Sequence, residues 1–474
     1  MFVLRNAAVC LAFIVALANI AAANEKPPQP NIVFLIADDL GSHDVGWRGS
    51  EIKTPNLDRL AASGAKLDQF YVQPVCTPTR ASLMTGRYPF RYGLQSGVVK
   101  PWAQYGLPLE KRLLPQALKE AGYQTAIVGK WHLGHFQPDY LPTRRGFDHQ
   151  YGHYNGALDY FAHIRDGGFD WHRDDKVNHD EGYSTELIGR EASRLIKERI
   201  ADKPLFLYVP FNGVHAPLQV PERYSDAYPQ FSGKRKTYAG MVTAMDEAIG
   251  KIVTTLEEAK LLDNTLIVFS SDNGGPAPGV ITSNGKLRAG KGTLYEGGVR
   301  VCAFATWAGH IKPSVVETPM HMTDWYPTLL QLAGAKLEQP LATDGRDIWP
   351  ALTGGTSSRD TFVLNLTPNN GAIRVGNWKL VTNGSSEAED EATEDTPTAA
   401  QKKRQGKKQR ATANIELFNL AEDPSEKHNL ATDNPEKVKD LQGRLAAFAK
   451  EAVPPKVAPK AASFVTPKIW GEVN

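Results

Sequence analysis

The sequence predicts an α/β fold in which helices cover both faces of a large, mostly parallel sheet. Short apolar runs rich in β-branched residues, with no polar alternation, are typical of strands buried on both faces. Patterns with helical spacing lie between these runs, as expected when crossover helices join parallel strands. The predicted strands are Asn31–Ala37, Thr125–Val128, Leu205–Val209 and Thr265–Ser270, and the predicted helices are Asn56–Ser63, Leu114–Ala121, Thr185–Glu198 and Tyr238–Glu258.

The first 23 residues have the pattern of a signal peptide and stand outside this fold. Arg5 gives a positive start, the apolar stretch Val9–Ile20 is short for a bilayer span, and Ala21–Ala23 provides the small residues of a cleavage site. We expect Met1–Ala23 to be removed from a secreted or periplasmic protein, with an uncleaved anchor as the alternative. No later segment is long and apolar enough for stable membrane insertion.

The chain divides near residue 360 into a main catalytic domain, residues 24–360, and a smaller C-terminal α+β subdomain, residues 361–474. In the second part, strand patterns predict a small antiparallel sheet and an amphipathic pattern predicts a helix over residues 435–452. The predicted strands are Phe362–Leu364, Ala372–Val375, Trp378–Val381 and Glu416–Asn419.

A charged insertion, at about residues 384–413, interrupts this subdomain. Its centre is acidic first and then strongly basic, with no aromatic residue, which predicts a disordered loop. Polyelectrolyte binding by Lys402–Arg410 is the alternative. The neighbouring acidic block can neutralise that basic run, so a solvated loop is favoured.

The charge balance argues against nucleic acid as a partner. The 474 residues include 54 basic and 52 acidic side chains, so the formal net charge is only +2. The composition is that of an ordinary globular protein, with 41% hydrophobic residues.

Cysteine usage singles out one residue. The chain has three cysteines, and Cys10 leaves with the signal peptide. Cys302 lies in the apolar run Val299–Ala305, which predicts a buried strand and a packing role. Cys76 is then alone in an oxidising compartment. Its thiol is either buried and inert or chemically converted.

Cys76 lies at a predicted junction between a strand, Leu67–Val72, and a short helix, Ala81–Thr85, with Pro78 near the first helical turn. Amide donors at the start of a helix and the nearby Arg80 suit an anionic ligand. They also predict a lowered thiol pKa and a reactive thiolate. A small buried residue at a turn is the alternative.

Each of the four core strands is followed by charged or metal-binding side chains. Because ligands of such sheets bind beyond the carboxyl ends of the strands, we expect these groups to share one crevice. Carboxylate and amide oxygens without soft ligands suit Ca²⁺ or Mg²⁺. The candidate metal ligands are Asp38, Asp39, Asp272 and Asn273, and the candidate cationic groups around them are Arg80, Lys130, His132, His215 and Lys291. A metal with several cations predicts transfer of sulfate or phosphate, whose oxygens gain charge in the transition state.

Five motifs in the same order resemble the type I sulfatases. They are Cys76–Arg80 continuing through Gly86-Arg87, Asn31–Leu40, Gly129–Gly134, Asn212–Pro217 and Ser271–Gly274. The resemblance covers nearly all of the mature chain outside the insertion. It is greatest for the arylsulfatase B (N-acetylgalactosamine-4-sulfatase) branch, through Leu113–Gly134, Leu141–Asp148 and Lys291–Arg300. It implies an alkaline-phosphatase-like fold.

The resemblance also implies a mechanism. The cysteine in the position of Cys76 is oxidised to formylglycine by a formylglycine-generating enzyme, and one hydroxyl of the hydrated aldehyde attacks sulfur. Cys76, Asp38, Asp39, Asp272 and Asn273 are then Ca²⁺ ligands. The implied roles of the others are Arg80 holding the hydrate, Lys130 and Lys291 the sulfate oxygens, His132 accepting the proton of the elimination step, and His215 acting as the acid for the leaving group.

The implied substrate is a sulfated sugar from a polysaccharide, such as GalNAc-4-sulfate, or an aryl sulfate. The polar stretch Tyr151–Asp175 is expected to line the sugar pocket, and a mobile surface loop is the alternative. Its candidate side chains are His153, Asp159, His163 and His172. Hydrolysis of a phosphodiester or phosphonate monoester, and an inactive protein that binds sulfated glycans, are the competing hypotheses. Unlike lysosomal members, a chain with converted Cys76 has no disulfide.

Overall fold

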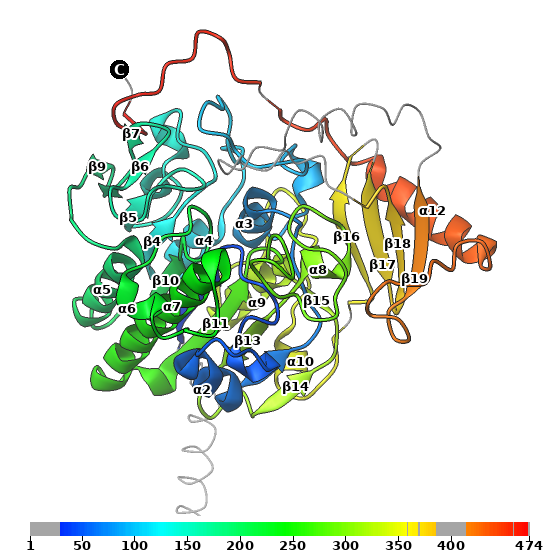
Figure 1. Ribbon diagram of the computed structural model, residues 1–474, viewed down its shortest axis with the longest axis horizontal. Helices are drawn as coiled ribbons and strands as arrows, with labels where there is room; N and C mark the ends of the chain where they lie inside the picture. The colour runs from blue at the N-terminus through cyan, green and yellow to red at the C-terminus, as the bar shows by residue number, and fades with distance from the viewer. Residues whose placement is uncertain (1–28, 358, 368–369, 385–413, 458, 473–474) are drawn as a thin grey trace, which may run out of the picture.

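A ten-stranded mixed sheet forms the centre of the computed structural model (Figure 1). Five neighbouring strands are parallel, and in spatial order they are β11 (Thr265–Ser271), β1 (Asn31–Ala37), β10 (Leu205–Pro210), β4 (Gln124–Lys130) and β5 (His149–His153). Beyond β11 lie β13 (Ala303–Thr306), β2 (Ala65–Leu67) and β14 (Ser314–Val316), and beyond β5 lie β8 (His172–Arg173) and β9 (Lys176–Val177). The α/β prediction is confirmed, with antiparallel strands added at both sides.

The structure describes residues 29–357, 359–367, 370–384, 414–457 and 459–472. The expected signal peptide and nearly all of the expected charged insertion lie outside these ranges. None of the described helices is both long and apolar enough to span a bilayer.

Alternate side chains of β1 pack into two separate cores because successive residues of a strand point to opposite faces. Phe34 lies in a core with α3 (Cys76–Thr85), α4 (Leu114–Glu120) and α9 (Trp325–Leu332). Leu35 lies in the opposite core with α2 (Pro55–Ser63), α5 (Ser184–Lys197) and α7 (Gly233–Glu258). Fully burying each such side chain contributes about 1.5–3 kcal/mol. The core strands lack alternating polar residues because helices cover both faces of the sheet.

Two expected strands are each divided between two sheets. The run 67–72 contributes Leu67, the last residue of β2, to the large sheet and β3 (Phe70–Tyr71) to a three-stranded sheet. The run 299–305 divides in the same way into β12 (Arg300–Val301) and β13. β3 pairs with β12, and β2 pairs with β13, so the two segments stay neighbours as they pass from one sheet to the other. The apolar pattern continues through the break because both sheets are buried.

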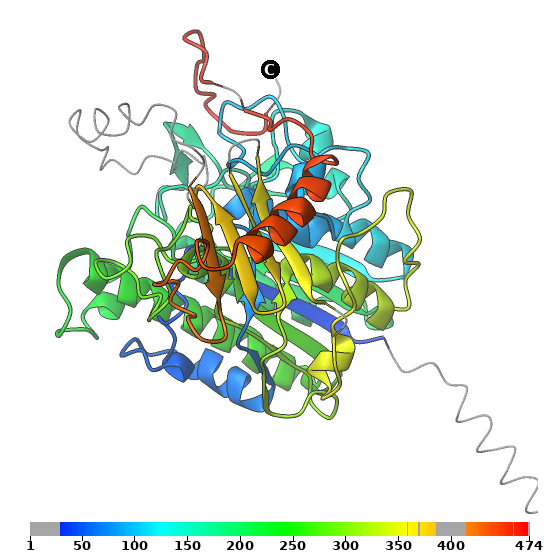
Figure 2. The ribbon, with the colours of Figure 1, turned by 90° about the vertical axis from the view of Figure 1, so that its right-hand side faces the viewer.

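A four-stranded antiparallel sheet follows the central one along the chain. Its strands are β16 (Thr361–Leu366), β17 (Gly371–Val375), β18 (Trp378–Thr382) and β19 (Ile415–Asn419), in that spatial order. Helix α12 (Pro435–Ala449) lies across one face, as Figure 2 shows. The other partners of this core include Tyr71, Tyr88 and Phe90 of the first part of the chain.

Short elements complete the chain between these layers. The remaining strands are β6 (Ile164–Arg165), β7 (Gly168–Phe169) and β15 (Met320–His321), the short helices are α6 (Glu222–Ser225), α8 (Glu296–Val299) and α10 (Trp349–Leu352), and single 3₁₀ turns lie at Gly46–Arg48, Pro89–Arg91, Pro138–Tyr140, Pro142–Arg144, Leu262–Asn264 and Met322–Asp324.

Candidate active site

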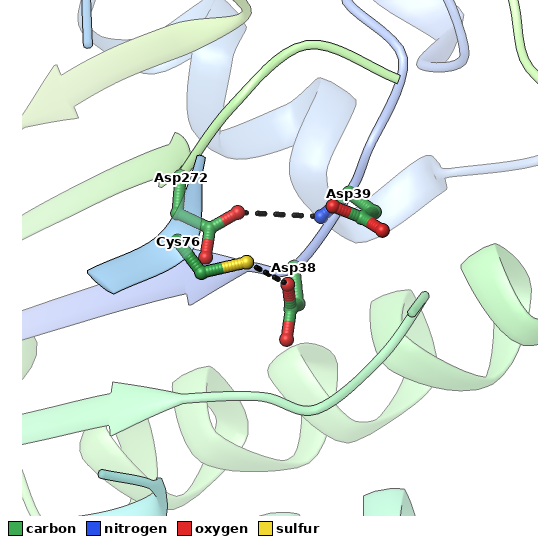
Figure 3. Close-up of side chains that lie close together, drawn as sticks. All are labelled: Asp38, Asp39, Cys76 and Asp272. Atoms are coloured by element: carbon green, nitrogen blue, oxygen red, sulfur yellow. Dashed lines mark hydrogen bonds between the residues drawn. The ribbon is translucent and has the colours of Figure 1, made fainter. Parts of the chain in front are cut away.

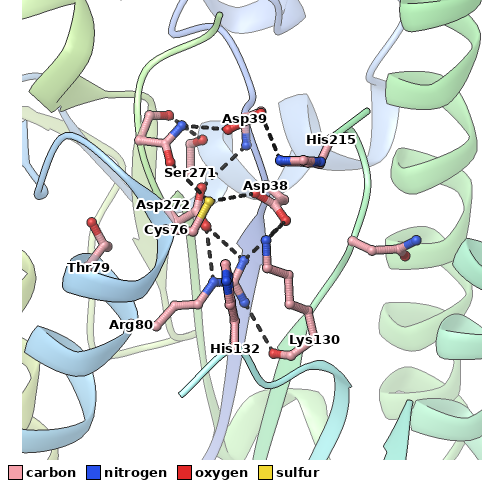
Figure 4. A network of polar contacts seen from close by, with 12 residues as sticks. Asp38, Asp39, Cys76, Thr79, Arg80, Lys130, His132, His215, Ser271 and Asp272 are labelled. Atoms are coloured by element: carbon pink, nitrogen blue, oxygen red, sulfur yellow. Dashed lines mark hydrogen bonds and ion pairs between the residues drawn. The ribbon is translucent and has the colours of Figure 1, made fainter. Parts of the chain in front are cut away.

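The four strand exits meet at one edge of the sheet (Figure 4). β1 ends at Ala37, so Asp38 and Asp39 follow it directly, and Asp272 and Asn273 follow β11. Lys130 is the last residue of β4, with His132 two residues later, and His215 lies in the turn after β10. In Figure 4, Arg80, Lys130 and His132 lie on one side of Cys76, and Asp39 and His215 lie on the other.

Three carboxylates and one thiol converge at the centre of the site (Figure 3). One ligand atom from each of Asp38, Asp39, Cys76 and Asp272 lies within 4.8 Å of the others, and all four residues are buried. The amide nitrogen of Asn273 donates to Asp39 Oδ1 at 2.7 Å, and its oxygen lies 3.4 Å from the Cys76 sulfur. Converging buried carboxylates are costly unless cations neutralise them. This oxygen-rich donor set fits a divalent metal ion.

Each of these carboxylates also has a cationic side chain against it. Arg80 donates through Nη2 to Asp272 Oδ2 at 2.8 Å, and the Lys130 ammonium donates to Asp38. On the opposite side, Lys291 Nζ donates to Asp39 Oδ2 at 2.9 Å. The cations predicted from four separate segments therefore surround one buried centre.

The neighbouring charges shift the pKa values of two carboxyl groups in opposite directions. Burial alone would raise the pKa of Asp38, but the charges of Lys130, His215 and Arg80 lower it well below its ordinary value. Burial raises the pKa of Asp272, and the negative charge of Asp38 raises it further. One carboxylate is thus held ionised while its neighbour resists ionisation, which is the electrostatic state that an added cation relieves.

Cys76 is the first residue of α3 and faces the carboxylates. Its sulfur lies 3.3 Å from Asp38 Oδ1. The expected lowering of the thiol pKa is wrong: burial raises the pKa of Cys76 well above its ordinary value, and the charges of Asp272 and Asp38 add to the rise. The prediction rested on the helix start and on Arg80, but the guanidinium of Arg80 donates to Asp272 and not to the thiol. The thiol is therefore neutral and unreactive as it stands.

His132 is held by the backbone of two other segments. Its amide donates to the Tyr154 carbonyl at 3.0 Å, and its Nε2 lies 3.2 Å from the Val99 carbonyl. Burial, followed by the charges of Lys130 and Arg80, lowers its pKa well below the ordinary value. His132 and Asp39 both have positive φ angles, 58° and 63°. Such backbone angles are costly for residues other than glycine and are enriched at functional sites.

His215 and Lys291 form the opposite wall. Lys291 Nζ lies 3.2 Å from His215 Nε2, and that nitrogen lies 3.6 Å from Asp39 Oδ2. Despite burial, the charge of Asp39 raises the pKa of Lys291 well above its ordinary value, so the lysine stays charged.

The four candidate sugar-binding residues occupy different surroundings. His153 is fully buried at the end of β5, in register with Lys130, and neither ring nitrogen has a hydrogen-bond partner within the part of the chain that the structure describes. His163 stacks on Trp171, with 4.5 Å between ring centroids, and His172 stacks on Tyr154 at 4.2 Å.

Asp159 caps a turn instead. Its Oδ1 accepts from the amides of Phe161 and Ala162. The alternative of a mobile surface loop is wrong for the three histidines, because all are buried between short strands.

Sequence reasoning missed the segment that covers Cys76. Val98 packs against Cys76, and the amide of Val99 donates to the Thr77 hydroxyl at 3.1 Å. Thr77 in turn donates to the His132 carbonyl at 2.9 Å. Apolar loop residues that act through their backbone carry no signal in a single sequence, whereas Thr77 lies inside the recognised motif.

Carboxylates that could hold a metal ion, surrounded by cationic side chains, lie buried at the carboxyl ends of a mostly parallel sheet, an arrangement suited to an anionic ester as substrate. The sulfatase family model matches residues 30–335. Arylsulfatase J of Mus musculus is 38% identical over 465 residues, which cover 91% of this chain and 78% of that protein. N-acetylgalactosamine-6-sulfatase of Homo sapiens is 36% identical over 70% of this chain and 67% of its own.

Solved structures that are similar to this one also include sulfated-sugar enzymes and related hydrolases. The crystal structure of Ps i-CgsB in complex with k-i-k-neocarrahexaose has a TM-score of 0.79 and 33% identity, covering 90% of this chain and 94% of that one. The phosphonate monoester hydrolase of Agrobacterium radiobacter, at 20% identity and a TM-score of 0.62, shares the fold alone. The chain therefore belongs to the sulfatase family, with an alkaline-phosphatase-like fold, and it is a sulfatase.

Proposed function

We propose that the enzyme removes sulfate from a sulfated sugar, GalNAc-4-sulfate or a related unit of a polysaccharide. The observation that carries the proposal is the buried centre where carboxylates, Cys76 and several cations converge. Support for a sugar comes from related proteins named for GalNAc-6-sulfate and from the carrageenan oligosaccharide bound by a similar structure.

Asp38, Asp39, Asp272 and Asn273, together with residue 76, are the groups that would hold Ca²⁺. Their hard oxygen atoms suit Ca²⁺, and the ligand atoms of the three carboxylates and Cys76 converge closely enough to hold one ion. When bound, the ion supplies positive charge against which a sulfate oxygen and the nucleophile can lie. Conversion of Cys76 to formylglycine supplies a hydrated aldehyde with two hydroxyls, in place of a thiol that stays protonated.

Lys130 and Lys291 lie on opposite sides of Cys76 and can hold the sulfate oxygens. Both ammonium groups are charged, because Asp38 and Asp39 raise their pKa values against the effect of burial. Charge grows on the sulfate oxygens as the ester bond breaks, so preorganised cations stabilise the transition state more than the ground state. Arg80, which donates to the carboxylate of Asp272, is the group that would hold the hydrate of residue 76.

His132 and His215 move protons. His132 is neutral because burial and Lys130 lower its pKa, so it can accept the proton of the elimination step. His215 lies on the far side, beside Lys291, where it can protonate the leaving sugar oxygen. His153 lies beside Lys130, and its ring, which has no hydrogen-bond partner among the described residues, remains a candidate for binding the sugar if the buried site opens to it. His163 and His172 stack on Trp171 and Tyr154 and so stabilise the segment around His153.

We further propose that the protein acts in the periplasm or after secretion, and that a formylglycine-generating enzyme matures it. We also propose that the catalytic domain ends at about residue 360 and that the charged insertion is a solvated loop. Support comes from the sequence features of residues 1–23 and from Cys76 being one of two cysteines beyond them.

The test is sulfate release from defined sulfated GalNAc, galactose and glucosamine, alongside an aryl sulfate and an aryl phosphodiester. We expect kcat/KM to be larger for sulfate esters than for the phosphodiester, and activity to vanish in Cys76→Ala. Cys302→Ala, which removes the other buried cysteine, is the matched control and keeps activity. A preference for the phosphodiester would overturn the proposal in favour of the competing hydrolase.

A further inference from the structure

The last described segment of the chain, residues 453–471 without Ala458, is an extended tail that runs back across the molecule. From α12 it passes along the upper end in both Figure 1 and Figure 2 and reaches β7. At its start, the Val453 amide donates to the Phe90 carbonyl at 2.9 Å, and the Lys456 amide donates to the Gly93 carbonyl at 2.8 Å. These two bonds fix one end beside the loop that follows α3.

The other end of the tail is fixed by Trp470. Its amide and the amide of Phe169 make reciprocal bonds, with Trp470 donating to Phe169 at 2.9 Å and Phe169 donating to Lys468 at 2.8 Å. The indole nitrogen donates to the Arg165 carbonyl at 2.8 Å, and the ring lies 5.5 Å from that of His135. Trp470 is 3% exposed, so this end is firmly seated.

Between its two ends the tail lies one layer outside the catalytic centre. The segment that covers Cys76 through Val98 and contacts His132 through Val99 also carries Trp102. The ammonium of Lys460 lies over the Trp102 ring, 5.4 Å from its centroid. His135, beneath Trp470, is three residues beyond His132. The tail therefore contacts two segments that also contribute to the site, one through Trp102 and the other through His135.

Between Glu451 and the exposed Glu472, all the charges of the tail are positive. Lys456, Lys460 and Lys468 are exposed, and the sequence has no acidic residue between Glu451 and Glu472. Within the described residues, none of the three ammonium groups forms an ion pair. Glu110 is near enough to Lys456 for their charges to interact, but its carboxylate is paired with Lys111 at 2.8 Å. Lys460 is held between the rings of Trp102 and Phe464, at 5.4 Å from each centroid. In a chain with a net charge of only +2, this is a concentrated cationic border.

We propose that this tail binds anionic groups on sugar units beyond the unit that is desulfated, so that the substrate class is a polyanionic oligosaccharide. The inference rests on the proposed function, because the tail borders that site. Sulfate or carboxylate groups along a glycan match three exposed ammonium groups on an extended segment. Exposed charge contacts are individually weak and are screened by salt.

The test compares two substrates in one variant. Lys456→Gln, Lys460→Gln and Lys468→Gln together should raise KM for a chondroitin 4-sulfate hexasaccharide about 10-fold at low salt, as expected for three weak charge contacts. kcat/KM for p-nitrophenyl sulfate should not change, and the KM difference should shrink at 0.5 M salt, a concentration at which charges are screened within about 4–5 Å. The matched control is Lys203→Gln, Lys260→Gln and Lys312→Gln, three exposed lysines that precede β10, β11 and β14 at the opposite edge.

Unchanged KM for the hexasaccharide, or an equal loss on both substrates, would overturn the inference. Calorimetric binding of the same hexasaccharide to Cys76→Ala, with and without the three tail substitutions, separates the tail from the chemistry. If the unsubstituted enzyme released sulfate from neither substrate, the proposed function would fail, and the binding titration would still decide the role of the tail: about 10-fold weaker binding supports it, and equal binding contradicts it.

Discussion

Two of the buried clusters of charge in the described part of the protein differ in how their charges face one another. In the active site, three carboxylates converge on a thiol, with cations outside them. In the second cluster, the ammonium of Lys379 lies between two carboxylates, 2.9 Å from Glu296 and 2.8 Å from Glu426. Tyr71 donates to Glu296 at 2.6 Å, and the Glu296 amide donates to Glu426 at 2.6 Å.

The difference teaches how a functional cluster is told from a structural one. Lys379 extends from β18 to α8, so the second cluster joins the small sheet to the rest of the protein, and its two carboxylates share the one lysine between them. The active-site carboxylates each have a cationic side chain against them, but they also face one another and the Cys76 sulfur around a centre that could hold a metal ion. Burial and shifted pKa values occur in both clusters, whereas convergence of like charges at strand exits occurs in one.

The largest expected effect is on the active-site side of this comparison. Cys76→Ala removes the residue that we propose is converted into the nucleophile, so kcat on an aryl sulfate should fall by at least about 10⁴-fold. The folded state should be as stable as before within about 1 kcal/mol, because the thiol is neutral and small. Circular dichroism and thermal unfolding measure the second quantity; a large loss of stability would show a structural role for Cys76.

The second cluster should behave in the opposite way. Lys379→Met leaves Glu296 and Glu426 buried without their cation, and it should lower the free energy of unfolding by about 3–5 kcal/mol. Urea unfolding measures the loss, while kcat of the protein that remains folded is retained. Lys437→Met, which breaks an exposed ion pair with Asp440, is the control and should cost under about 1 kcal/mol. Equal stability of Lys379→Met and this control would remove the contrast between the clusters.

Metal removal tests why the active-site charges converge. EGTA should lower Tm, since an ion present at 100 times its Kd stabilises the folded state by about 2.7 kcal/mol, and added Ca²⁺ should restore it. Asp39→Asn should abolish the response to both. A Tm that EGTA leaves unchanged in the unsubstituted protein would mean that the carboxylates are neutralised by the protein's own cations.

The smallest effect is a pH dependence of the second cluster. Burial, together with the charge of Glu296 and in spite of Lys379, raises the pKa of Glu426 to about 7. A raised folded pKa means that the folded state holds the proton more tightly than the unfolded state. Stability is therefore greatest below about pH 4.5 for this group and is lost as pH rises through 7, by about 1–3 kcal/mol. Glu426→Gln should flatten this part of the stability profile; an identical profile would contradict the assignment.

The sequence predicts the parts of the protein that repeat a simple pattern. The parallel strands and both helical layers follow from apolar runs without alternation, and Asp38, Lys130, His215 and Asp272 are found because each follows such a run. The branching of residues 67–72 between two sheets is invisible, since both halves are equally apolar. The raised pKa of Cys76 is also invisible, because it depends on which carboxylates the fold brings against the sulfur.

The central claim is that residue 76 does not act as a cysteine. Mass spectrometry of the peptide that contains Cys76, from enzyme co-expressed with a formylglycine-generating enzyme and active on an aryl sulfate, tests this most directly. The account predicts a peptide in which the thiol is replaced by an aldehyde or its hydrate, in proportion to the active fraction. A fully active enzyme whose peptide carries an unmodified thiol would contradict it.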